Sequence, residues 1–221
     1  MPRRTTITFS NGMAAALFVA GLGRIVVLVK SDDAIWLIVA LSAGAAAILG
    51  FYIAERSRTQ DPLLAFRKLA SLQLLAGVSA ALILAALYML PVFRPVSVAG
   101  WVEVAGPVVA LLFFPTLLIS AATWLSIVEG GVTVRSSGIA MIGVIAGVAL
   151  VWSPEALLTP IWGIASASVL LHFAGLIAFS EQYRVGRRWH VLGTVMGVTA
   201  MITSLLAALM TVEQFFVIGS V

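Results

Sequence analysis

The chain has no cysteine and very little charge. With no cysteine among its 221 residues, disulfides, thiolate metal sites and cysteine nucleophiles are all excluded. Charged residues make up only 10% of the chain, against about a quarter in an ordinary soluble domain. Hydrophobic residues make up 62%, and the mean hydropathy is +1.12. We therefore expect one all-helical polytopic membrane domain over residues 1–221 and no separate soluble domain.

Signatures of catalysis and of cofactors are also missing. The chain contains no HExxH, P-loop or GxSxG motif and no intramembrane aspartate pair, so we expect no enzyme. Retinal needs a Schiff-base lysine within the last helix, and Lys30 and Lys68 both fall at the ends of apolar runs. A bis-histidine haem needs two histidines at one depth, whereas His172 lies in mid-run and His190 at a run's edge. We expect no cofactor and no metal.

Seven apolar runs are long enough to cross a bilayer as helices. A helix needs roughly 20 mostly apolar residues to span the hydrocarbon core. The runs lie near 9–29, 35–54, 69–92, 101–127, 138–152, 160–180 and 190–211. The sequence thus predicts a seven-helix bundle.

Basic residues in the loops orient this bundle. Ten lie in loops on one side of the predicted bundle, whereas the other side receives only Lys30 and Arg94. The ten are Arg3, Arg4, Arg56, Arg58, Arg67, Lys68, Arg135, Arg184, Arg187 and Arg188. Because cytoplasmic loops carry the excess of lysine and arginine, we expect the N-terminus inside and the C-terminus outside a cell membrane. These charges face anionic lipid headgroups rather than nucleic acid.

One stretch of the chain is repeated. SNGMAAALFVAG at 10–21 returns as SSGIAMIGVIAG at 136–147. In the same register Ile35 and Trp36 fall on Ile161 and Trp162, Glu55 falls on Glu181, and Arg58 falls on Arg184. Matches of Trp, Glu and Arg favour a duplication over chance in an apolar composition, and such repeats are common in transporters. We expect repeat units at 9–92 and 136–212, joined by the helix at 101–127.

This three-plus-one-plus-three plan resembles that of the SWEET sugar transporters, the PnuC-type vitamin transporters and the PQ-loop proteins. A similar duplication has been proposed for microbial rhodopsins. The resemblance implies passage of a small solute through a cavity between the two units. The chain departs from these families in three respects. It has no Pro-Gln pair, it has no proline within 9–29 or 138–152, and its predicted N-terminus lies on the opposite side from that of the SWEET transporters.

Arg24 and Glu103 are charged residues within predicted spans. Arg24 lies six residues before the outer end of the first run, about 9 Å at ~1.5 Å per residue. Glu103 falls at a similar depth in the fourth run and is the expected partner of Arg24. The pair either ties two helices together or binds an anion in an outward vestibule. The repeat places Leu150 opposite Arg24, so only one half of the bundle has this charge.

His172 and the prolines of the fourth run are the remaining candidate site residues. His172, near the middle of its span, is either a hydrogen-bonded packing residue or a proton relay or substrate contact. Pro107 and Pro115 indicate either a kinked packing helix or a gating hinge. Hydroxyl residues follow Pro115 and often repair the hydrogen bond that a proline removes.

Glycine pairs are expected at helix contacts. Gly143 with Gly147 and Gly193 with Gly197 form two GxxxG patterns. These patterns allow close helix packing, either within the bundle or against a second copy or another protein.

Two functions follow from these features. The first is a small-solute transporter or channel with its cavity between the two three-helix units. The second is a non-catalytic membrane subunit or sensor that acts through a protein partner. A transporter predicts a polar cavity reached by Arg24 or His172, whereas a dry contact of glycine and alanine speaks against it.

Overall fold

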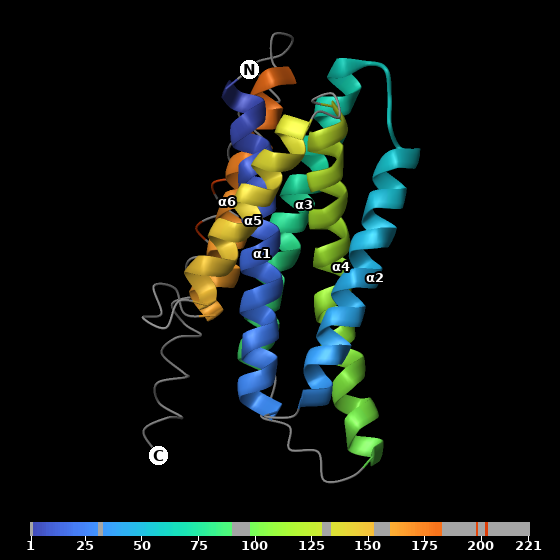
Figure 1. The fold of residues 1–221 in the computed structure, drawn as a ribbon, viewed down its shortest axis with the longest axis vertical. Helices are drawn as coiled ribbons and strands as arrows, with labels where there is room; N and C mark the ends of the chain where they lie inside the picture. The colour runs from blue at the N-terminus through green and yellow to red at the C-terminus, as the bar shows by residue number, and fades with distance from the viewer. Residues whose placement is uncertain are drawn as a thin grey trace.

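The structure, a computed structural model, describes residues 2–30, 33–89, 98–129, 134–152 and 160–182, together with Val198 and Ile202. The five continuous stretches contain six α-helices (Figure 1). They are α1 (Pro2–Lys30), α2 (Asp33–Arg56), α3 (Pro62–Met89), α4 (Val98–Glu129), α5 (Val134–Trp152) and α6 (Pro160–Gln182). All six are long and apolar enough to span a membrane. The structure therefore supports a multi-pass membrane protein. The seventh predicted span, 190–211, lies outside the described residues, apart from Val198 and Ile202.

The six helices match the first six predicted runs, and some extend beyond them. α3 begins at Pro62 rather than near residue 69. The carbonyl of Asp61 accepts the first helical hydrogen bond from the Ala65 N–H at 2.9 Å. Asp before Pro is a favourable helix start, because proline suits the first helical position and lacks only an N–H that would have no helical partner. The predicted run starts only after Arg67 and Lys68, whereas α3 continues through these two basic residues from a start five residues before Arg67.

Successive helices run in alternating directions (Figure 1). The N-terminus, the α2–α3 connection and the start of α5 lie at one end of the bundle. Several of the basic residues that the sequence assigns to the inner side belong to these segments. There Lys68 donates from Nζ to the Ser57 carbonyl at 2.6 Å. A cation beside the last carbonyls of α2 complements the negative end of the helix dipole.

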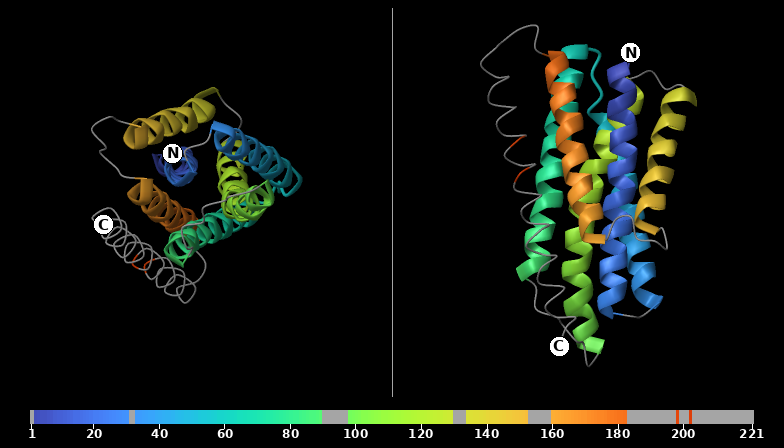
Figure 2. Two further views of the ribbon diagram at one scale, coloured as in Figure 1. Left: turned by 90° about the horizontal axis from the view of Figure 1, so that it is seen from below. Right: turned by 90° about the vertical axis from the view of Figure 1, so that its left-hand side faces the viewer.

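α1 is the central helix of the described bundle. It packs against α5, α6 and α4, and in Figure 2 it lies inside the ring formed by the other helices. α3 packs on α6 and α4, whereas α2 packs mainly on α4 and α5 mainly on α1. The core between them includes the fully buried side chains of Phe18, Leu84, Leu112 and Ile164. α2 and α5 are therefore the peripheral helices of this part of the chain.

The described contacts do not show the symmetry of a duplicated bundle. In an exact two-fold arrangement, the contact of α1 with α6 would recur between α5 and α2. α1 packs along much of α6, whereas α2 and α5 make no comparable contact over the described residues. The duplication therefore stays a prediction from the sequence.

Candidate functional site

The first and fifth helices meet through glycine. A Cβ added to Gly12 would overlap the Ala140 carbonyl, and one on Gly143 would overlap the Phe9 carbonyl. On Gly147 a Cβ would come 2.7 Å from the Met13 carbonyl oxygen. The predicted GxxxG pair of α5 is thus buried against α1, so it does not offer its face to a second molecule. The Gly193–Gly197 pair lies outside the described residues.

Arg24 joins the C-terminal ends of the same two helices. Its Nη1 donates to the carbonyl oxygen of Val151 at 2.5 Å. Val151 belongs to the last turn of α5, where carbonyls lack partners within the helix and the dipole favours a cation. The side chain of Glu103 lies outside the described residues, so its pairing with Arg24 stays a prediction. The described contact of Arg24 favours its structural interpretation.

A groove of about 430 Å³ separates α5 from α2 and α4. Its lining residues are mostly alanine, valine and isoleucine, with hydroxyls from Thr116 and Ser120 and the half-exposed Trp152. They come from α1 (Ala15, Ala16, Val19, Ala20), α2 (Ala43, Ala47), α4 (Thr116, Ile119, Ser120) and α5 (Val144, Val148, Trp152).

The groove lies at the boundary where the sequence predicts a cavity, but its chemistry differs from the prediction. Neither Arg24 nor His172 lines it. An apolar wall cannot replace the hydrogen bonds that a polar solute loses on leaving water. The groove therefore suits an apolar occupant, and it is not the polar cavity that a transporter of polar solutes predicts.

The prolines of α4 do not interrupt the helix. α4 continues through both Pro107 and Pro115, and the side chain of Pro107 is outside the described residues. Next to Pro115, the buried Thr116 hydroxyl has no partner among the described residues, so it does not repair the missing hydrogen bond. Thr123 bonds the Ile119 carbonyl at 2.7 Å, farther along the helix. The hinge therefore stays a prediction.

A layer of polar side chains crosses the bundle at mid-depth. The Gln73 amide donates from Nε2 to Asn11 Oδ1 at 2.9 Å, and Asn11 donates from Nδ2 to the Ala122 carbonyl at 3.4 Å. Both side chains are fully buried. These bonds connect α3, α1 and α4. The sequence analysis did not single out Asn11 or Gln73, although an amide in the middle of an apolar span is itself an indication of a specific contact.

His172 lies beside this layer, in the contact between α6 and α3. Its side chain is fully buried, and its Nδ1 is 2.8 Å from the Ser168 carbonyl oxygen. The Ser168 hydroxyl donates to the Gly77 carbonyl at 2.7 Å. The imidazole covers Gly77, where a Cβ would come 2.5 Å from Cε1. His172 is thus hydrogen-bonded through Nδ1 and packed against α3, whereas its Nε2 has no partner among the described residues.

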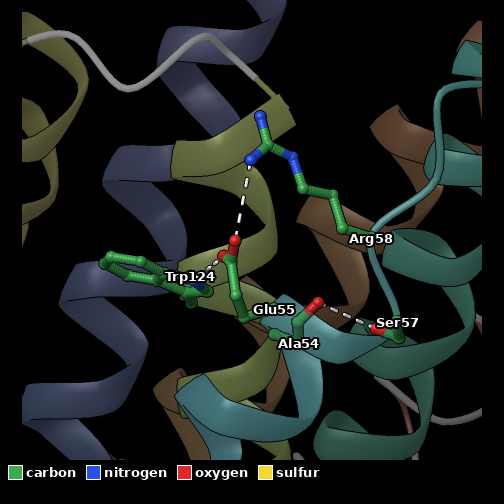
Figure 3. A network of polar contacts seen from close by, with 5 residues as sticks. All are labelled: Ala54, Glu55, Ser57, Arg58 and Trp124. Atoms are coloured by element: carbon green, nitrogen blue, oxygen red, sulfur yellow. Dashed lines mark hydrogen bonds and ion pairs between the residues drawn. The ribbon is translucent and has the colours of Figure 1, made fainter.

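A polar cluster joins α2 to α4 near the end of the bundle where the N-terminus lies (Figure 3). Trp124 Nε1 donates to Glu55 Oε2 at 3.0 Å, and Arg58 lies 3.6 Å from Glu55 Oε1. The rings of Trp124 and Phe51 are 5.4 Å apart. The Glu55 and Arg58 side chains are about half exposed, which indicates a contact that holds α2 to α4 rather than a binding pocket.

No protein-family model, curated protein or solved structure matches the chain. Within the described stretches, no group of three His, Asp or Glu side chains is placed to hold a metal ion. The groove and the buried polar layer are therefore the features on which a functional proposal rests.

Proposed function

We propose that this protein binds a slender apolar molecule, such as a lipid acyl chain, which enters the groove between α1, α2, α4 and α5 from the bilayer. The observation that carries the proposal is the apolar lining of this groove. It lies along helices that are long enough to span a membrane, so the groove borders hydrocarbon rather than water.

The groove has the size of one acyl chain and is too small for a transmembrane helix. Its volume of about 430 Å³ equals roughly 14 groups the size of a water molecule, at ~30 Å³ each. A methylene group is of similar size, so one acyl chain fits. A transmembrane helix is about 10 Å across with its side chains and would place little more than one turn in this volume.

The sequence predicts a transporter of a small solute, and this proposal specifies that the solute is lipophilic. The same hypothesis includes the predicted seventh helix, the predicted duplication and a cell-membrane location with the N-terminus inside. It involves no catalytic step. The alternative, a non-catalytic subunit that acts through a protein partner, now rests on the Gly193–Gly197 pair, because the α5 pair is buried against α1.

Photo-crosslinking tests the proposal. Proteoliposomes containing a phospholipid with a diazirine near the end of one acyl chain are irradiated, and the labelled residues are mapped by mass spectrometry. We expect labelling concentrated on groove residues such as Val144 and Val148. Ala47→Phe, which fills the groove, lowers this labelling several-fold. Ala45→Phe places the same bulk on an exposed position of α2 and leaves it unchanged.

Even labelling of outward side chains such as Ile48 and Ile145, unaffected by Ala47→Phe, contradicts the proposal. The same liposomes separate binding from transport. A transporter moves the labelled lipid between leaflets faster than empty liposomes do, and Ala47→Phe slows it. If the groove residues are labelled but the lipid moves no faster than in empty liposomes, the groove is a binding site and the protein does not transport this lipid.

A further inference from the structure

Two hydrogen-bond chains approach each other where α3 meets α6, and each ends in an acceptor. The first begins at the Ala122 carbonyl, which can only accept. Asn11 must therefore turn its NH₂ group toward Ala122 and its oxygen toward Gln73. Gln73 in turn uses its NH₂ group on Asn11, which leaves Gln73 Oε1 as the free end. The orientation of both amides is thus set by one backbone carbonyl.

The second chain begins at the Ser168 carbonyl. Since this oxygen also only accepts, Nδ1 of His172, 2.8 Å away, carries the proton. In a neutral imidazole the other nitrogen, Nε2, then has a lone pair and no hydrogen. The Ser168 hydroxyl donates to the Gly77 carbonyl, so its hydrogen is already used.

The two free acceptors belong to one small region. Gln73 and Gly77 are one turn apart on the same face of α3, and the His172 ring covers Gly77. On α6, a Cβ at Gly175 would lie 3.4 Å from Gln73 Cβ. Gln73 Oε1 and His172 Nε2 are both buried, and neither has a partner among the described residues. A buried acceptor without a donor is costly in free energy, and here both acceptors belong to the contact between α3 and α6.

We propose that a small neutral molecule that donates two hydrogen bonds, in its simplest form water, binds between Gln73 Oε1 and His172 Nε2. An anion is excluded, because it would add a third acceptor. A cation is disfavoured, because the acidic residues of α4 and α6, Glu103, Glu129 and Glu181, belong to end segments of their helices. Internal waters of this kind typically satisfy buried polar groups that the protein leaves unpaired.

The bound donor completes a polar chain across four helices. It links Ala122 on α4, Asn11 on α1 and Gln73 on α3 to His172 on α6. On both sides of the bound donor, the side-chain hydrogens point away from it, in the direction of the Ala122 and Ser168 carbonyls. Amide side chains do not release their protons. This series of hydrogen bonds therefore holds the bound molecule in place and does not conduct protons. The site is independent of the groove, since none of these residues lines it.

Nitrogen NMR of a single histidine tests this site. The chain has two histidines, so His190→Gln leaves His172 alone. Solid-state spectra of the ¹⁵N-histidine-labelled variant in bilayers should show a protonated Nδ1, an unprotonated Nε2 and magnetisation transfer from an exchangeable proton to Nε2. Loss of the transfer in D₂O without any C–H correlation identifies water. A C–H correlation identifies the hydroxyl or amino group of an organic molecule.

Variants on α3 complete the test. Gln73→Leu removes one of the two acceptors and should lower the transfer several-fold. Ser79→Ala removes another buried polar group of α3, bonded only to the Ala76 carbonyl, and should leave the transfer unchanged. A proton on Nε2 overturns the proposal, because that nitrogen would then have no lone pair with which to accept a hydrogen bond. An Nε2 without any contact to a donor also overturns it, and this result needs no variant beyond His190→Gln.

Discussion

Arg24 on α1 donates from Nη1 to the Val151 carbonyl on α5, 2.5 Å away and 127 residues along the chain. The bond gives a charged partner to a carbonyl at the end of α5. It also holds the peripheral α5 against the central α1 at the C-terminal ends of both helices. The predicted repeat pairs Arg24 with Leu150, which is the residue before its hydrogen-bond partner.

We expect Arg24→Leu to destabilise the protein by about 1–2 kcal/mol, because it removes a charge-assisted bond and a favourable dipole interaction. Thermal unfolding in detergent measures the change. Arg135→Leu is the matched control: Arg135 is exposed at the start of α5, where a positive charge opposes the dipole, so its loss should be neutral or slightly stabilising. Equal stability of Arg24→Leu and wild type would show that the contact contributes nothing.

The α1–α5 contact predicts opposite effects for two glycines of one helix. Gly143→Ala places a Cβ against the Phe9 backbone and should cost about 1–3 kcal/mol through overpacking. Gly138→Ala meets nothing within 4 Å and should stabilise by up to about 1 kcal/mol, because alanine has the higher helix propensity. Unfolding of both variants in one detergent gives the comparison. A harmless Gly143→Ala would mean that the helices are not this close.

The Asn11–Gln73 bond predicts non-additive substitutions. Asn11→Leu leaves the buried Gln73 amide without its acceptor, and Gln73→Met leaves Asn11 Oδ1 without its donor, whereas the double variant removes both groups. We expect a coupling free energy of about 0.6–1.7 kcal/mol, the range of such bonds within membranes. A double-mutant cycle of unfolding free energies measures it. Simple additivity would show that the two side chains do not interact.

The cluster of Trp124, Glu55 and Arg58 predicts that two substitutions lower the stability by different amounts. Trp124→Phe keeps a ring beside Phe51 but removes the donor to Glu55, and should cost about 0.5–1.5 kcal/mol. Arg58→Ala breaks an exposed ion pair at 3.6 Å and should cost less than about 0.5 kcal/mol. If Arg58→Ala proves the more damaging change, the ion pair within the α2 end segment contributes more to stability than the indole bond between α2 and α4.

Much of the candidate site could not be predicted from the sequence. Arg24 and His172 were recognised as unusual because a charge or an imidazole is costly within a span. Their partners, the Val151 carbonyl and the Ser168 carbonyl, could not be found in this way, because every residue has a backbone carbonyl. Asn11 and Gln73 were overlooked, since each is a single amide whose meaning depends on the other.

The sequence by itself determined that the chain crosses a membrane, and it located the six helices that the structure describes. This is possible because a spanning helix satisfies its own backbone, so its existence depends only on a local run of apolar residues. Only the tertiary structure decided which faces meet: that Gly143 and Gly147 face α1, that the groove is apolar, and that Gln73 and His172 each bury an acceptor without a partner among the described residues. Between helices in lipid the hydrophobic drive is absent. Close fit and paired polar atoms select their contacts, and these depend on residues far apart in the chain.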